Sequence, residues 1–96
     1  MSRREYDISI TVNGIRINKV ITDPHYEVKH AESVSDDLII KLVQALDGKA
    51  FDPTDLEPPF SYFRTDPITV EGKKYRLIWL LEDDQIYIGV VNAHRR

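Results

Sequence analysis

The sequence predicts an α+β fold, in which an antiparallel sheet of about five strands carries one main amphipathic helix on one face. Three observations predict it. The dipeptide Asn13-Gly14 separates two alternating, β-prone runs. A helical pattern of apolar residues then occupies residues 36–47. Finally, two apolar, β-prone runs flank the polar corner at residues 82–84. We expect one domain over residues 1–96, with a hairpin at 6–22, the helix at 36–47 and C-terminal strands at 61–92.

The composition is typical of a soluble globular protein with a modest core. The chain has 96 residues, of which 42% are hydrophobic and 30% charged. No apolar run approaches the roughly 20 residues of a membrane span, and the first residues lack a secretory signal. There is no cysteine and no glycine-rich loop that could cradle a phosphate, and the five-residue spacing of His25 and His30 does not suit a shared metal ion. We therefore expect a cytoplasmic protein without membrane contact, metal or cofactor.

The charge balance places any basic site in the second part of the chain. Thirteen basic and 16 acidic residues give a net charge of −3, unlike the basic balance of a free-standing nucleic-acid binder. Residues 1–59 hold 7 basic and 11 acidic side chains, a net −4, whereas residues 60–96 hold 6 and 5, a net +1. An anion-binding surface would therefore be a local patch in residues 60–96.

The N-terminal hairpin follows from turn chemistry. Residues 6–12 alternate, with Ile8, Ile10 and Val12 on one face, and residues 15–22 return as the second strand. Both central positions of a type I′ turn need a positive φ, which Asn and Gly adopt readily. Asn13-Gly14 is therefore a strong hairpin signal.

A serine cap begins the helix. Ser35 is the expected N-cap, and Asp36 and Asp37 follow where the helix dipole favours acidic groups. The apolar residues that share one helical face are Leu38, Ile39, Leu42, Val43 and Leu46. Gly48 provides the C-terminal stop. Before the helix, residues 23–30 form either a short helical turn or an extended link.

The segment after the helix is less regular. Residues 49–59 contain three prolines and are expected to form a surface loop. A short strand at 61–64 is interrupted at Asp66-Pro67, and a further strand follows at 68–70. Several side chains here either line an interaction groove or fill the core: Phe60, Tyr62, Phe63 and Arg64.

The terminal hairpin has two different faces. A two-residue turn at Asp83-Asp84 would pair Glu82 with Gln85, whereas a three-residue loop would shift the register by one. With the two-residue turn, the apolar face is core and comprises Tyr75, Leu77, Trp79, Leu81, Ile86, Ile88 and Val90. The other face is mixed and comprises Arg76, Ile78, Leu80, Tyr87, Gly89, Val91 and Arg95. Function is expected on the mixed face.

This hairpin resembles the C-terminal half of the RelE/ParE-like toxin superfamily. The resemblance covers residues 73–96 and rests on Tyr75-Arg76, an acidic turn, and an apolar strand that ends in His94-Arg95-Arg96. The superfamily includes ribosome-dependent mRNA endoribonucleases and gyrase-directed toxins. The resemblance implies a phosphate-binding arginine at Arg76 and a second basic or catalytic group among His94, Arg95 and Arg96. The chain differs from the family in its acidic charge and in opening with a hairpin instead of a strand and two helices.

Two functions from different classes follow. In the first, the chain acts on RNA or the translation machinery, with His94 as acid or base and with Arg76 and Arg95 stabilising the phosphate. Contacts to RNA or to a partner would come from Tyr87, Arg64 and Arg96, and the implied partners are RNA, the ribosome or an antitoxin-like protein. In the second, a non-catalytic α+β domain binds a protein partner through the open sheet face, and the same side chains are ordinary strand and tail residues.

Overall fold

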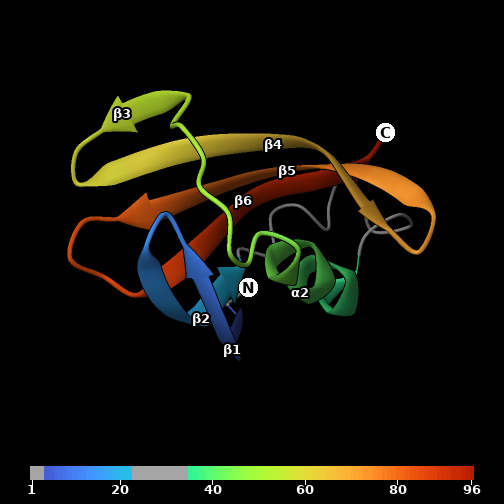
Figure 1. Cartoon of the computed structure of the whole chain (residues 1–96), viewed down its shortest axis with the longest axis horizontal. Coiled ribbons are helices and arrows are strands. Elements are labelled where there is room, and N and C mark those ends of the chain that lie inside the picture. The colour runs from blue at the N-terminus through green and yellow to red at the C-terminus, as the bar shows by residue number, and fades with distance from the viewer. Residues whose placement is uncertain (1–3, 23–34) are drawn as a thin grey trace.

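The computed structural model describes residues 4–22 and 35–96, and within them six strands form one mixed sheet (Figure 1). The elements are β1 (Arg4–Val12), β2 (Ile15–Thr22), α2 (Asp36–Gln44), β3 (Asp55–Glu57), β4 (Phe60–Val70), β5 (Lys73–Glu82) and β6 (Tyr87–Arg95). The order across the sheet is β1-β2-β6-β5-β4-β3. Neighbouring strands are antiparallel except β2 and β6, which are parallel. The predictions for residues 23–30, with His25 and His30, lie outside the described residues.

The predicted α+β fold class is wrong. Strands make up 63% of the described residues and helix 11%, so the protein is mostly sheet with one short helix in its described part. The helix is shorter than predicted because it ends at Gln44, and residues 45–48 form turns. The purely antiparallel sheet of about five strands is also wrong, because the N-terminal hairpin places β2 parallel to β6.

The longest strand passes through a proline. β4 joins the two short strands expected on either side of Asp66-Pro67. Its register with β5 shifts between Thr65 and Ile68. Pro67 therefore lies at a bulge, where its missing N–H removes no ladder hydrogen bond. The bulge lets one strand run past the proline and turns the Asp66 carboxylate toward Arg76 on β5.

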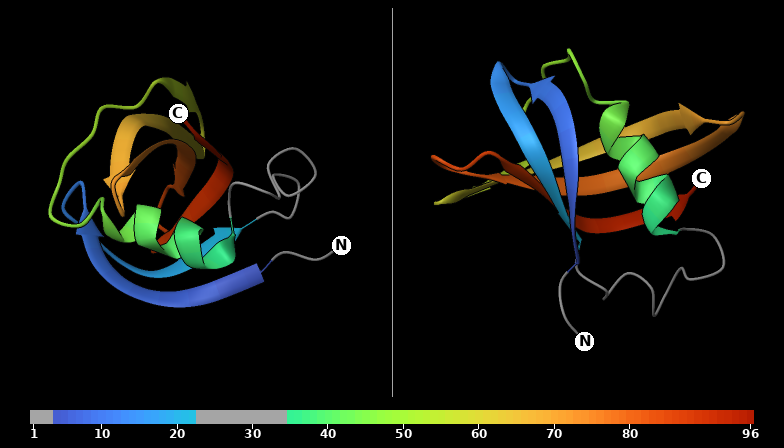
Figure 2. Two further views of the ribbon diagram at one scale, coloured as in Figure 1. Left: turned by 90° about the vertical axis from the view of Figure 1, so that its right-hand side faces the viewer. Right: turned by 90° about the horizontal axis from the view of Figure 1, so that it is seen from below.

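The sheet curls around a core whose centre is Trp79 (Figure 2). The Trp79 side chain is fully buried, and its ring stacks on Phe63 with centroids 4.2 Å apart. Phe51 meets the same ring edge-on at 5.6 Å, and the indole N–H donates to Thr65 Oγ1 at 3.0 Å. Helix α2 packs on the concave side against β1, β2, β4 and β6 and buries Ile39, Leu42 and Val43. The concave face of the sheet therefore packs into the core, and the convex face is directed toward solvent.

Polar contacts fix the N-terminus of α2. The Ser35 hydroxyl accepts a hydrogen bond from the Leu38 N–H at 3.2 Å, as the predicted N-cap should. The Asp36 carboxylate accepts hydrogen bonds from Arg4 Nη2 at 2.9 Å and from the Tyr6 hydroxyl. The hydrogen bond to Asp36 is the largest cause that raises the pKa of Tyr6, because an ionised phenol would face the carboxylate. These contacts connect the start of the helix to β1.

Asn13 connects the hairpin to the chain that follows α2. Asn13 and Gly14 have φ angles of 52° and 75°, which a type I′ turn requires. The Asn13 side chain donates from Nδ2 to the Phe51 carbonyl at 3.1 Å and accepts from the Phe51 N–H at 2.6 Å. Its backbone N–H donates to the Lys49 carbonyl at 3.0 Å. One turn residue therefore holds residues 49–51, and with them Phe51, against the core.

Two replacements of Asn13 are expected to distinguish the contribution of its turn conformation from that of its side-chain hydrogen bonds. Asn13→Ala should lower the free energy of unfolding by about 2–3 kcal/mol, because it loses both side-chain bonds and strains a positive φ. Asn13→Gly keeps the turn and should lose only about 1–2 kcal/mol. Urea unfolding followed by circular dichroism measures both. Equal losses for the two variants would contradict the contribution of the turn conformation.

Candidate functional site

The terminal hairpin positions the candidate side chains, and its register differs from the predicted one. Leu81 pairs with Ile88 and Trp79 with Val90, so the connection is longer than a two-residue turn and the expected pair Glu82–Gln85 is wrong. The register then shifts between Ile78 and Trp79. Members of the predicted apolar face that are buried are Tyr75, Leu77, Trp79, Leu81, Ile88 and Val90. Ile86 is instead 51% exposed, and Ala93 is buried in the core.

The register shift decides which basic residues share a face. Arg76 pairs with His94, and Tyr75 pairs with Arg95. Paired residues of a sheet project to the same side. Because Tyr75 is buried on the concave side, Arg95 projects to that side at the end of the sheet, and His94 lies beside Arg76 on the convex side. The mixed face predicted from the sequence therefore gains His94 and loses Arg95.

Asp66 holds two arginines on the convex face. Its Oδ2 accepts a hydrogen bond from Arg76 Nε at 3.0 Å. Its Oδ1 lies 3.0 Å from Arg96 Nε, without the alignment of a hydrogen bond, so that contact is an ion pair only. The Asp66 side chain is 14% exposed, against 22% for Arg76 and 47% for Arg96. The carboxylate is therefore enclosed, and the guanidinium groups lie outside it.

Arg64 extends this group along β4. It lies two residues before Asp66, pairs with Ile78, and is exposed. In the part of the chain that the structure describes, Arg64 forms no ion pair. We call Arg64, Arg76, His94 and Arg96, which share the convex face with Asp66, the arginine cluster. Four of the six predicted site residues belong to it.

Tyr87 lies apart from the arginine cluster. It is at the start of β6, whereas His94 is near the end of the same strand. Its hydroxyl donates a hydrogen bond to Glu82 Oε1 at 2.6 Å. A contact between Tyr87 and an anion held by the cluster would therefore require a long ligand.

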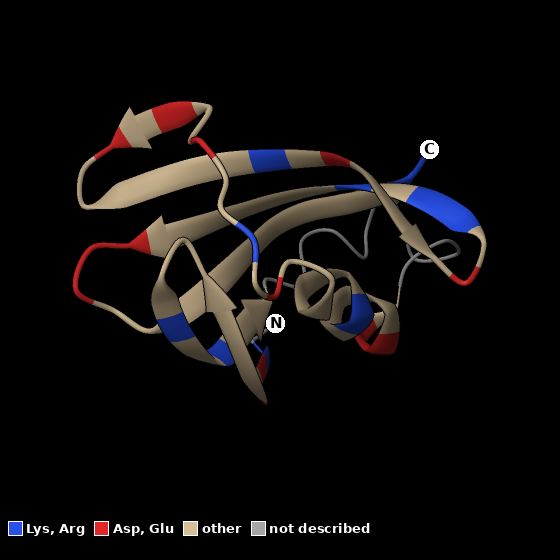
Figure 3. Cartoon of the chain, in the orientation of Figure 1, with Lys and Arg blue, Asp and Glu red and all other residues tan. Residues whose placement is uncertain are grey.

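Basic residues predominate at one end of the sheet and acidic residues at the other (Figure 3). Around the β4–β5 turn and the end of β6 lie the basic residues Lys73, Lys74, Arg76, Arg95 and Arg96, with the acidic Glu71 in the turn itself. Around β3 and the β5–β6 connection lie the acidic residues Asp52, Asp55, Glu57, Glu82, Asp83 and Asp84. The protein has a net negative charge, but the arginine cluster is locally cationic.

The sequence pattern did not identify Asp66 as a site residue. The sequence shows it only as half of an Asp-Pro pair that interrupts a β-prone run. A proline inside such a run is itself a signal for a bulge, and a bulge redirects the side chain beside it. Asp66 could therefore have been marked as a residue with a special position, although its two arginine partners come from distant parts of the chain.

Residues 4–22 and 35–96 contain neither a candidate metal site nor a helix suited to span a membrane. Among them, no grouping of three or more His, Asp or Glu side chains could hold a metal ion. In the same residues, no helix has both the length and the apolar character to cross a bilayer. In comparisons with known proteins, no protein-family model, no curated protein and no solved structure matches this chain.

Proposed function

We propose that the protein binds single-stranded RNA through the arginine cluster. The observation that carries the proposal is the pair of guanidinium groups, Arg76 and Arg96, held by one enclosed carboxylate. The resemblance of the terminal hairpin to RelE/ParE-like toxins supports the same class of ligand. A cytoplasmic location, proposed from the sequence, would place the protein together with RNA.

The geometry of the cluster suits a phosphate group. Both arginines approach Asp66 through Nε, so their terminal NH2 groups are available to an outside anion. A guanidinium held in this way has less rotamer freedom to lose on binding, and its planar fork matches two phosphate oxygens. His94 and Arg64 add further positive or hydrogen-bonding groups on either side. Successive phosphates of a strand could therefore be contacted by neighbouring side chains.

Aromatic rings next to Arg64 suit unpaired bases. Phe60 and Tyr62 alternate with the buried Phe63 along β4, so they lie on the same convex face as Arg64, with ring centroids 6.3 Å apart. Aromatic side chains on an open sheet face are a common platform for stacking unpaired bases. Asp55 pairs with Tyr62 on the β3 side and would repel phosphates there. The backbone of a bound strand should therefore pass on the Arg76 side.

The test is the affinity of a fluorescein-labelled single-stranded RNA, measured by fluorescence anisotropy at low salt. Arg76→Ala should weaken binding by about tenfold, the loss expected for one charge-assisted contact. Arg76→Lys retains the charge, so it should lie between the wild type and Arg76→Ala. Arg16→Ala is the matched control, because Arg16 is exposed on β2 and contacts Ser9. Its affinity should equal that of the wild type.

The salt dependence provides a second measurement. Each lost phosphate contact should reduce the slope of log affinity against log salt by about 0.7 for a single strand. Absence of binding at low salt, or equal losses in Arg76→Ala and Arg16→Ala, would overturn the proposal. Cleavage of the bound strand that is lost in His94→Ala would extend it to the predicted ribonuclease chemistry. If the protein binds the RNA as expected but leaves it intact, the proposed function is restricted to RNA binding.

A further inference from the structure

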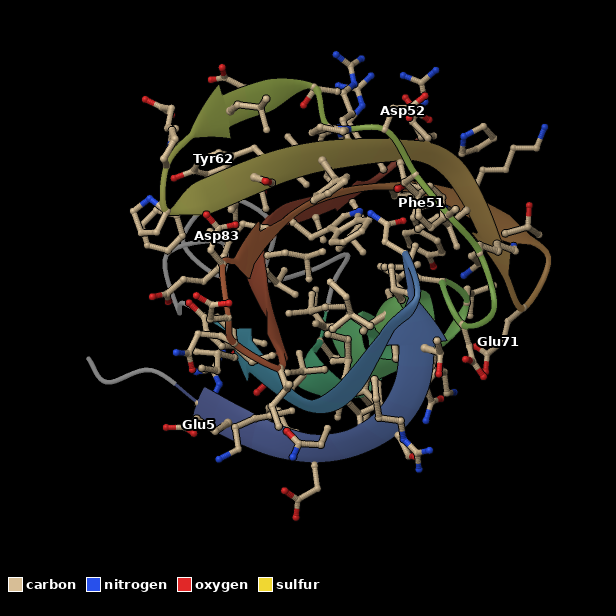
Figure 4. All side chains as sticks on the ribbon, turned by 60° about the vertical axis from the view of Figure 1, so that its left-hand side comes forward. Glu5, Phe51, Asp52, Tyr62, Glu71 and Asp83 are labelled. Carbon is tan, nitrogen blue, oxygen red and sulfur yellow. The ribbon has the colours of Figure 1, made fainter. Side chains whose placement is uncertain are left out.

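The end of the sheet opposite the arginine cluster contains a hollow of about 530 Å³, which we call the mouth. Figure 4 looks toward this end, with Asp83 on its rim. The mouth is formed by the β1–β2 turn, the start of β4 and the β5–β6 connection, and its lining residues are Asn13, Ile15, Pro53, Ser61, Phe63, Leu81, Glu82, Asp83, Asp84, Gln85 and Ile86. None of them belongs to the arginine cluster.

The mouth has an apolar interior and apolar rim residues. Phe63 and Leu81 are buried members of the core that reach its wall. Ile15 and Ile86, two of the exposed large aliphatic residues among the described residues, also line it, with 39% and 51% of their surface exposed. Exposed aliphatic side chains beside a hollow are typical of a surface that binds a partner.

The polar part of the rim is acidic. Glu82, Asp83 and Asp84 line the mouth, and no lysine or arginine does. In the described part of the chain, neither Asp83 nor Asp84 forms an ion pair. Two neighbouring carboxylates without a cation raise each other's electrostatic energy, and an incoming positive charge lowers it. The mouth therefore has charge complementarity to a basic ligand and repels nucleic acid.

The loop that forms the rim is held in place by backbone hydrogen bonds. The Asp83 N–H donates to the Pro59 carbonyl at 2.8 Å, and the Asn18 N–H donates to the Ile86 carbonyl at 3.0 Å. These bonds connect the loop to the segment before β4 and to β2. A preformed rim lowers the ordering cost of binding.

A second hollow of about 410 Å³ adjoins the mouth. It is lined by Glu5, Asn18, Lys19, Ile21 and Tyr87, and it shares Gln85 and Ile86 with the mouth. The two hollows therefore adjoin at Gln85 and Ile86, so an extended chain could occupy both.

We propose that the mouth binds a basic protein segment, which places an aliphatic or aromatic side chain against Phe63, Leu81 and Ile86. Its lysine or arginine residues lie beside Asp83 and Asp84. This site is at the acidic end of the sheet and is independent of the proposed RNA site. A protein with both sites could hold RNA and a basic protein at the same time.

The test uses a fluorescein-labelled peptide of alternating lysine and leucine, titrated with the full chain at low salt. Two further peptides serve as probes, one with glutamate in place of lysine and one with serine in place of leucine. Asp83→Asn combined with Asp84→Asn should weaken binding of the lysine–leucine peptide by about fivefold. Asn tolerates the positive φ of 62° at position 84, so the turn should be retained. Ile86→Thr keeps a β-branched side chain and should weaken binding by about fivefold.

The matched control is Asp55→Asn combined with Glu57→Gln, because these acids are exposed on β3 and do not line the mouth. Its affinity for the lysine–leucine peptide should equal that of the wild type, and circular dichroism checks that every variant is folded. All mouth variants should bind the labelled RNA as the wild type does, which separates this proposal from the RNA site. Equal binding of the glutamate–leucine peptide, or an equal loss in the β3 control, would overturn the proposal. Dimerisation that the Asp83 and Asp84 substitutions abolish would also overturn it, because a second copy would then be the occupant.

Discussion

Replacement of Trp79 by alanine is expected to lower the free energy of unfolding by about 3–5 kcal/mol. The indole is fully buried and contacts rings from two other segments, Phe63 on β4 and Phe51 in the loop after α2. Its removal leaves a cavity that the curled sheet cannot close, and it also leaves the Thr65 hydroxyl without its donor. A loss of this size is a large fraction of the stability of a domain, which is about 5–15 kcal/mol.

The control for this prediction is Trp79→Phe. It retains an aromatic ring against Phe63 but loses the indole N–H, so we expect a smaller loss of about 1–3 kcal/mol. Urea unfolding followed by far-ultraviolet circular dichroism measures both variants, because Trp79 is the one tryptophan of the chain and fluorescence would vanish with it. If the free energy of unfolding of the alanine variant were within about 1 kcal/mol of the wild-type value, the central position of Trp79 in the core would be contradicted.

Leu42→Ala should lower the free energy of unfolding by about 2–5 kcal/mol. Leu42 is fully buried in the contact between α2 and the concave face of the sheet. Alanine has the best intrinsic helix propensity, so the loss reports on packing and not on helix formation. Amide hydrogen exchange should show that α2 loses protection before the central strands do, because its contacts to the sheet are weakened.

Gln44→Ala is the matched control in the same helix. Gln44 is exposed, so its replacement should change the free energy of unfolding by less than about 0.5 kcal/mol. If the two variants were equally stable, α2 would not be contributing to the core through Leu42. Thermal unfolding by calorimetry gives an independent comparison of the two proteins.

The sequence predicted the local features of the fold and not the pairing of distant strands. Asn13-Gly14 specifies its turn and Ser35 its cap because both effects depend on adjacent residues. The parallel pairing of β2 with β6 could not be predicted, because an alternating strand has the same pattern in either direction. The continuity of β4 through Pro67 was hidden for a similar reason: a bulge depends on the partner strand as well as on the proline.

The candidate site was partly predictable for the same reasons. Arg76 was correctly assigned to the mixed face, because it alternates with Tyr75 and Leu77 on one strand. The position of Arg95 was wrong because it depends on the register shift in β6, which has no local signature. Asp66 and Arg96 meet only after three strands have paired, and their contact therefore requires the whole sheet.

The place of β6 between β2 and β5 has a consequence for synthesis on the ribosome. The N-terminal hairpin leaves the ribosome early, but β6, which joins it to the remaining strands, is the last described strand to emerge. Until then the nascent chain exposes two unpaired strand edges, one on β2 and one on β5. Contacts of such high sequence separation form slowly, so we expect completion of the sheet, and with it the Arg76–His94 pair, to be the slow step of folding.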